Sequence, residues 1–218
     1  MKLTRILMSM LTLLLTGWLS VAGAQSIPTS AGVYYLVGRL YVDPTSGNAE
    51  VVGYIPYING IGDSSTLFNG TPSERTAYFT FRTSLSISSL PSNGDVTPLL
   101  GTPGTYNIYY NPSPKNDWSN LDSFSGGQLI AQFKRPQVFV VQFDTFPFSE
   151  HTITETLIKT EDFIFKGQEF NFKDLAPGGV TLYNYISNTH LPAAAGYSVV
   201  EPYAGNAVAV ASENQDEK

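Results

Sequence analysis

The chain contains no cysteine. Disulfide bridges, thiolate metal ligands, thiol catalysis and lipid attachment through an N-terminal cysteine are therefore excluded. Core burial and backbone hydrogen bonding have to hold the fold together without covalent cross-links.

Charged residues are also scarce. They make up 14% of the 218 residues, whereas about 25% is usual in globular proteins. The balance is acidic, with a formal net charge of −6. Because no cluster of Lys and Arg opposes that balance, we expect neither nucleic-acid binding nor docking onto an anionic lipid surface.

The one long apolar run lies at the N-terminus. Lys2 and Arg5 precede an apolar stretch over residues 6–15, and small residues follow at 22–24. This order predicts a secretory signal peptide over residues 1–24 that is removed by cleavage. The stretch is too short for a comfortable membrane span, which needs about 20 residues. An uncleaved N-terminal anchor is the alternative. We expect a secreted, periplasmic or other extracytoplasmic protein that is not inserted in the membrane after cleavage.

Aromatic and turn-forming residues are plentiful, with 13 Tyr, 13 Phe, 19 Gly and 14 Pro. This composition is typical of pleated sheets joined by tight turns. Alternating or β-rich segments predict strands over residues 33–42, 50–58, 76–88, 105–110, 128–134, 138–146, 152–159, 163–165, 169–172 and 180–186. No run of ten or more residues has a helical period; single helical turns are possible at 160–165 and 172–175.

The pattern predicts an all-β protein with one domain. The fold is a single antiparallel β-sandwich or β-barrel of roughly eight to ten strands, and the sequence does not choose between the two. After the signal peptide we expect a flexible lead-in over residues 25–32, the all-β domain over 33–203 and a flexible acidic tail over 204–218.

Catalytic candidates are few. A carboxylate-dependent hydrolase needs two acids about 5–10 Å apart, and Asp144 and Glu155 lie on or beside predicted strands. Arg82 shares one face of a predicted strand with Tyr78 and Thr80. This face either lines a cavity or is exposed to solvent. The chain has no G-x-S-x-G sequence, so no nucleophile elbow is indicated.

No metal site is predicted. The two histidines, His151 and His190, are not spaced like zinc ligands. Calcium is the one cofactor that the sequence could accommodate, because residues 43–50 and 116–122 are rich in Asp, Asn and Ser, whose oxygen atoms are calcium ligands. Turn formation explains both segments without an ion.

A long loop over residues 111–127 places aromatic rings beside amide and carboxylate groups. Sugars and other small molecules are bound by such combinations, and long loops without secondary structure are often functional. The predicted ligand-binding residues are Tyr109, Tyr110, Asn111, Asp117, Trp118 and Asp122. In the alternative interpretation, a tyrosine belongs to the core and Trp118 fastens the loop.

Three functions fit the sequence. The first is an exported, non-enzymatic β-domain that binds a small molecule, a glycan or another surface component. The second is an enzyme with an aromatic-lined β-barrel cavity, either a cyclase or isomerase or a glycan-active hydrolase. The third is a structural envelope or matrix component, which needs no pocket.

Overall fold

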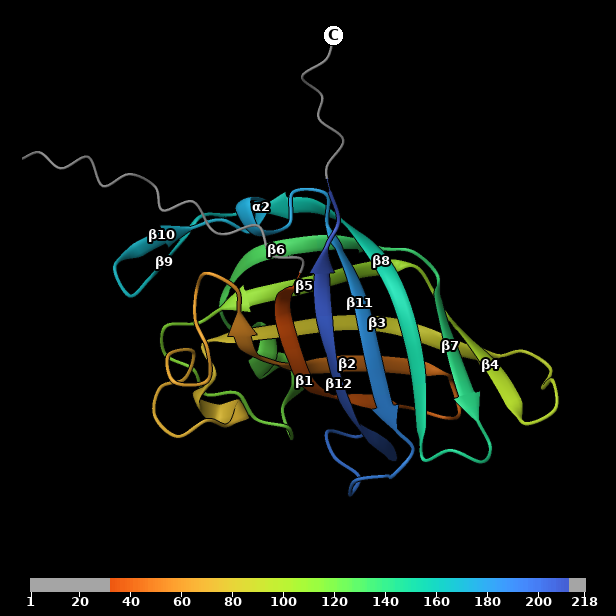
Figure 1. Ribbon diagram of the computed structural model, residues 1–218. Helices are drawn as coiled ribbons and strands as arrows, with labels where there is room; N and C mark the ends of the chain where they lie inside the picture. Colours follow the sequence, from red (N-terminus) through yellow and green to blue (C-terminus); the bar gives the residue numbers. More distant parts are fainter. Residues whose placement is uncertain (1–31, 212–218) are drawn as a thin grey trace, which may run out of the picture.

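The strands of the computed structural model close into a barrel (Figure 1). The structure describes residues 32–211; the predicted signal peptide and nearly all of the predicted lead-in lie outside this range. The elements are β1 (Gly32–Val42), β2 (Asn48–Ile58), η1 (Glu74–Thr76), β3 (Phe79–Ser89), β4 (Val96–Gly101), β5 (Gly104–Tyr110), η2 (Leu121–Ser125), β6 (Gln128–Arg135), β7 (Val138–Phe143), β8 (Phe148–Thr160), β9 (Phe163–Phe165), β10 (Gln168–Phe170), α2 (Phe172–Leu175), β11 (Val180–Ser187) and β12 (Val199–Ala209).

All pairings in the large sheet are antiparallel. A closed ring of eight strands runs β11-β12-β1-β2-β3-β5-β6-β8 and returns to β11. Closure gives each of these strands two hydrogen-bonded neighbours, so the ring has no free edge. Of the two architectures left open by the sequence, the protein adopts the barrel.

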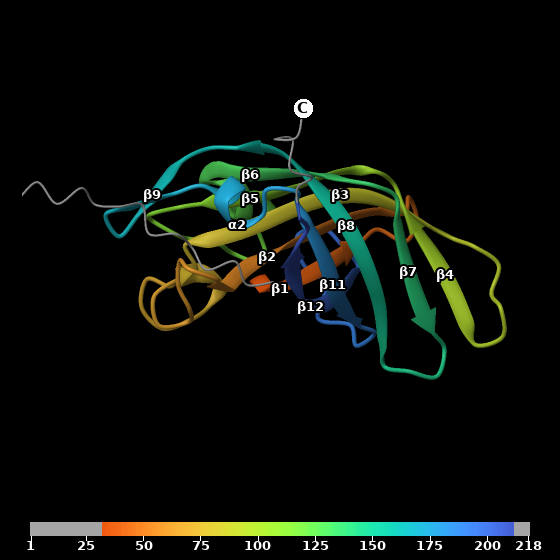
Figure 2. The ribbon, with the colours of Figure 1, turned by 45° about the horizontal axis from the view of Figure 1, so that its top comes forward.

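Two further strands, β4 and β7, extend the sheet beyond the ring. β4 precedes β5 in the chain, with a break at Thr102-Pro103, and β7 follows β6 after a break at Pro136. β5 and β6 pair at one end of the barrel, whereas β4 and β7 pair with each other and with β3 and β8 at the other end. Figures 1 and 2 show β4 and β7 side by side at that end.

The opposite end is filled by aromatic side chains. The short β9–β10 hairpin and α2 lie there (Figure 2), and Phe163, Phe165 and Phe172 are buried among them. Phe79 makes edge-on contacts with Phe163 and Phe165 at centroid distances of 5.7 and 5.2 Å. Such pairs add to the free energy gained from burial alone.

Glycines give the barrel wall room for a large interior ring. Gly38 and Gly53 are directly paired across β1 and β2, and a Cβ on them would lie 2.9 and 2.6 Å from Cζ of Phe81. The fully buried Phe81 ring can therefore lie against the backbone and stack on Tyr106 at 5.5 Å.

The structure differs from the sequence prediction at two strands. β4 forms in a segment predicted as a Pro- and Gly-rich connection, because pairing with β3 and β7 stabilises it. β12 continues to Ala209, past the expected start of the tail at Ala204, because β1 and β11 pair with it on both sides. The helical turn at 172–175 is confirmed as α2, whereas residues 163–165 form β9.

Candidate functional site: the barrel cavity

The barrel encloses a cavity of ≈ 90 Å³ towards the β4–β7 end. Every strand of the large sheet contributes to its lining. Leu85, Ile87 and Leu99 near its mouth are only partly buried, whereas Tyr106, Arg135 and Glu155 further in are 0–3% exposed. A mainly apolar wall with a few polar groups is the usual form of a small-molecule site.

Glu155 is the most unusual residue of this cavity. Its side chain is fully buried, and neither carboxyl oxygen has a hydrogen-bond partner. Burial raises the pKa of Glu155 to about 8, despite a lowering influence from Arg135. The carboxyl group is therefore mostly protonated at neutral pH.

Arg135 extends from β6, the strand beside β8. Nε donates to the Thr83 hydroxyl at 3.1 Å, and Nη1 and Nη2 donate to the carbonyls of Thr102 and Ser84, both at 2.8 Å. A Cβ at Gly104 would lie 2.8 Å from Nη2, so glycine leaves the space that the guanidinium occupies. Burial lowers the pKa of Arg135, but a guanidinium stays charged at any ordinary pH.

His151 lines the cavity four residues before Glu155 on β8. Its Nε2 lies 3.1 Å from Nδ2 of Asn184, the residue opposite on β11, while its Nδ1 is buried without a partner. Burial lowers the pKa of His151 to about 4, and Arg135 adds to this effect. The imidazole is therefore neutral at pH 7.

Tyrosines surround the same group of side chains. Tyr34, Tyr106 and Tyr203 are buried, and desolvation raises the pKa of each hydroxyl well above 10. The hydroxyls of Tyr34 and Tyr106 are close enough to influence each other, but neither meets hydrogen-bond geometry. Tyr106 and Tyr203 line the cavity.

Glu201 stands apart, near the mouth. It is partly buried, and its Oε1 lies 3.3 Å from Nε2 of His190, an ion pair when the imidazole is protonated. Desolvation raises the pKa of Glu201, and His190 opposes that change.

The three predicted catalytic candidates lie in different places. Glu155 is among the residues that line the cavity. Arg82 lies on the outer wall, where it bonds Glu50 at 3.0 Å and Asp122 at 2.6 Å. Asp144 is exposed just beyond β7, where its amide donates to the carbonyl of Asp95. The structure therefore does not bring Arg82 or Asp144 to Glu155.

The predicted loop residues are divided between the two sides of the sheet. Tyr110 faces inwards and stacks on Phe79 at 5.2 Å, whereas Trp118 packs outside on Phe124 at 4.8 Å and under the guanidinium of Arg39 at 4.4 Å. Tyr109 is paired with Thr80 of β3. Burial raises the pKa of Tyr109, and the charge of Arg82 on the outer wall opposes this rise. Asn111 accepts a hydrogen bond from the Ser113 amide.

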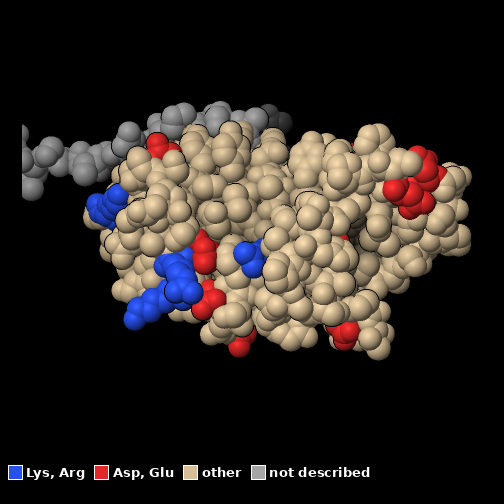
Figure 3. Space-filling view, turned by 90° about the horizontal axis from the view of Figure 1, so that it is seen from below, with Lys and Arg blue, Asp and Glu red and all other residues tan. Residues whose placement is uncertain are grey.

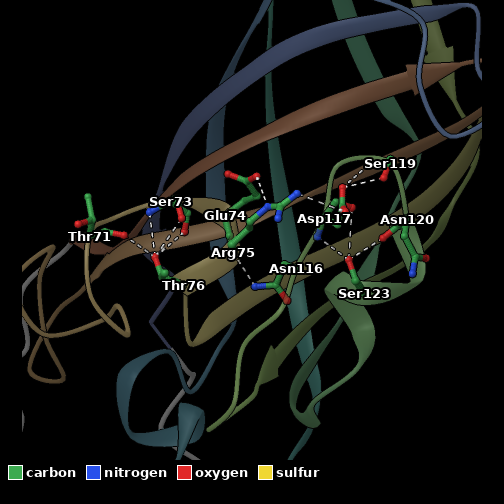
Figure 4. A network of polar contacts seen from close by, with 10 residues as sticks. All are labelled: Thr71, Ser73, Glu74, Arg75, Thr76, Asn116, Asp117, Ser119, Asn120 and Ser123. Atoms are coloured by element: carbon green, nitrogen blue, oxygen red, sulfur yellow. Dashed lines mark hydrogen bonds and ion pairs between the residues drawn. The ribbon is translucent and has the colours of Figure 1, made fainter.

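Polar groups of this loop are tied to the protein itself (Figure 4). The Asp117 carboxylate accepts from the amide and hydroxyl of Ser119 at 2.9 and 2.7 Å, and Arg75 lies 3.6 Å away. Asn116 donates to the carbonyls of Glu74 and Ala77. These contacts fasten residues 116–123 to the segment around η1.

The two segments considered for calcium contain local turns. Asp43 accepts from the Thr45 amide and the Ser46 hydroxyl, as Asp117 does from Ser119, and these bonds lower the pKa of both carboxyl groups. Within residues 32–211, no three His, Asp or Glu side chains are grouped closely enough to hold a metal ion.

The sequence indicates Glu155 as a candidate but not the residues around it. Glu155 is separated from Ile153 and from Leu157 by one residue each, and alternate residues of a strand face the same side, so Glu155 shares their inward face. Arg135 lies just outside the strand predicted over residues 128–134. A residue preceding proline favours extended backbone, which keeps Arg135 on β6.

Comparison with protein-family models, curated proteins and solved structures finds no match for this chain. In the described part, no helix has the length and apolar character needed to cross a bilayer.

The face of the molecule shown in Figure 3 carries few charged side chains.

Proposed function

We propose that this protein is a non-enzymatic binding protein that holds a small, mainly apolar molecule inside its barrel. The observation that carries the proposal is the set of buried polar atoms without partners beside the cavity: both carboxyl oxygens of Glu155, the Tyr106 hydroxyl and Nδ1 of His151. A buried polar group without a hydrogen bond costs about 1–3 kcal/mol. A ligand that bonds to these groups would recover that free energy.

The cavity supports the proposal better than the loop around Trp118 does. The loop's Asp117 and Asn116 already bond to protein groups, and Tyr110 faces away from Trp118 into the barrel. The cavity residues have both the space and the free bonding capacity that a ligand requires.

A direct test is titration calorimetry of the full chain with a panel of small amphipathic molecules. Val140→Phe fills the cavity from β7, and Phe139→Trp, on the exposed neighbouring position, is the matched control. We expect at least one compound to bind to the unmodified protein and to the Phe139→Trp control. The Val140→Phe variant should not bind that compound. Absence of binding across the panel, or binding unaffected by Val140→Phe, would overturn the proposal.

A second candidate is an enzyme that moves protons within this cavity, as a cyclase or isomerase does. The favouring observation is Glu155, because an acid with a pKa of about 8 can both give and take a proton near neutral pH. Under this alternative, NMR of a bound compound would show conversion by the unmodified protein and none by Glu155→Gln. Unchanged compound in both samples rejects it.

We propose that the protein acts outside the cytoplasm. The support is the basic, apolar and small-residue order of residues 1–24. N-terminal sequencing of protein exported by an expressing cell is expected to begin at Gln25. An intact N-terminus beginning at Met1 would contradict this.

A further inference from the structure

Donors predominate among the cavity groups that lack partners. The amide nitrogen of Asn184 can only donate, so Nε2 of His151 accepts from it, and the neutral ring carries its hydrogen on Nδ1. That N–H has no acceptor. The Tyr106 hydroxyl also has no partner. The His151 N–H requires a hydrogen-bond acceptor, and the Tyr106 hydroxyl can donate to the same ligand.

Arg135 adds a positive charge to these donors. It is 3% exposed, and its three hydrogen bonds go to an uncharged hydroxyl and two carbonyls. A guanidinium has five N–H groups, so two remain for another acceptor. The nearby Glu155 is mostly protonated at neutral pH and supplies little opposing charge. A buried charge without a counter-ion is unfavourable, and an anionic ligand would supply one.

The walls between this group and the mouth are apolar. Val138, Val140 and Ile153 line the cavity from β7 and β8, and Leu85 and Leu99 line it from β3 and β4. The volume of ≈ 90 Å³ corresponds to about six to nine water-sized groups. A ligand of up to about ten non-hydrogen atoms is therefore an appropriate size.

We propose that the cavity selects a monocarboxylate with a hydrocarbon tail, its carboxylate bound by Arg135 and Tyr106 and its tail directed towards Leu85 and Leu99. This inference rests on the proposed binding function and names the chemical class of the ligand. Octanoate, which has eight carbons and two oxygens, is the probe that represents the class.

Glu155 makes this binding depend on pH. In its protonated form it donates to the carboxylate; once ionised, it repels the ligand. The groups that act on Glu155 are Arg135 from β6 and the three tyrosines Tyr34, Tyr106 and Tyr203. The other wall carboxylate, Glu201, is paired with His190 near the mouth. Affinity for a carboxylate therefore falls as the pH rises through about 8.

The experiment compares octanoate, 1-octanol and octylamine by titration calorimetry of the full chain at pH 6.5. We expect octanoate to bind at least tenfold more tightly than 1-octanol, and octylamine to bind most weakly. Tyr106→Phe removes one hydrogen bond to a charged group and should weaken octanoate about tenfold, with a smaller effect on 1-octanol. Because this hydroxyl has no partner in the protein, the variant should fold like the unmodified chain.

Glu155→Gln separates the role of protonation from that of shape. The amide keeps a donor at every pH, so octanoate should bind the variant with similar affinity at pH 6.5 and pH 9. The unmodified protein should bind octanoate about tenfold more weakly at pH 9 than at pH 6.5, because the ionised Glu155 places a negative charge beside the negatively charged ligand.

The outcomes distinguish this inference from the proposed function. Equal affinity for octanoate and 1-octanol, both abolished by Val140→Phe, would overturn the carboxylate inference and leave the binding function standing. Failure of all three compounds, together with failure of the wider panel, would overturn both. Unchanged octanoate affinity in a folded Tyr106→Phe variant would also contradict the inference.

Discussion

The guanidinium of Arg135 acts on the carboxyl group of Glu155 from the neighbouring strand, yet donates its hydrogen bonds elsewhere. Thr83, Ser84 and Thr102 receive them, while both oxygens of Glu155 stay without a partner. The attraction lowers the pKa of Glu155, but desolvation outweighs it. Arg135 is thus held in place by neutral groups, and Glu155 is kept protonated by burial.

The first prediction concerns Glu155 and stability above neutral pH. Its pKa is raised from 4.5 to about 8 on folding, so the unfolded chain releases this proton at lower pH than the folded protein does. The free energy of unfolding therefore falls as pH rises from 4.5 to 8 and levels off above that. Glu155→Gln should remove this decline, a difference on the order of a few kcal/mol. Urea unfolding at pH 5, 7 and 9 measures it; parallel curves for both proteins would contradict the prediction.

The second prediction concerns His151 and acid. Its pKa is lowered from 6.5 to about 4 on folding, so stability from the neutral ring is complete above pH 6.5. It is lost as pH falls from 6.5 to 4. His151→Gln should reduce the acid sensitivity in that window. Thermal unfolding at pH 4.5 and 7 tests this, with His190→Gln as the control, because His190 is largely exposed. An equal effect of the two variants would refute the assignment to His151.

The third prediction concerns Gly53. A Cβ there would lie 2.6 Å from Cζ of Phe81 and would also meet the Val37 carbonyl on the paired strand. Gly53→Ala should destabilise the protein by about 1–3 kcal/mol or more through overpacking. Gly126→Ala is the control, since its Cβ would meet nothing closer than 3.4 Å. Chemical denaturation compares them, and a Gly53→Ala variant as stable as the control would argue against this close approach.

The fourth prediction concerns the loop over residues 111–127. The buried Thr80 hydroxyl donates to the carbonyl of Phe124 at 2.6 Å, 44 residues further along the chain. Thr80→Val should cost about 1 kcal/mol and speed hydrogen exchange of η2 amides. The exposed Thr152 supplies the control substitution, Thr152→Val. Unaltered exchange in η2 would show that this bond does not fasten the loop.

The predictable part of the fold came from local patterns. Alternation of Phe79 and Phe81 with polar neighbours placed β3 and its inward face correctly, because side chains on a strand alternate between faces. β4 and β12 were not predicted. Pro98 and Gly101 weaken the local signal in β4, and Ala204, Gly205 and Ala207 weaken it in β12. Those strands depend on partners far away in the sequence.

The site was less predictable than the fold. The strand parity of Glu155 was readable, but its meeting with Arg135 requires the pairing of β6 with β8. Glu155 comes close to Tyr34 and Tyr203 only because the barrel closes. Trp118 was the most conspicuous residue of the loop, and its packing on Arg39 and Phe124 depends on contacts that no local pattern encodes.

The pairing of β1 with β12 sets an order of events for the growing polypeptide. Ten residue pairs, from Gly32–Val208 to Val42–Val199, join the first described strand to the last. The ring cannot close before β12 has been synthesised. Contacts this distant are formed slowly, because chain ends must first meet by diffusion. Until β12 is in place, neither the ring nor the cavity that it lines can be complete.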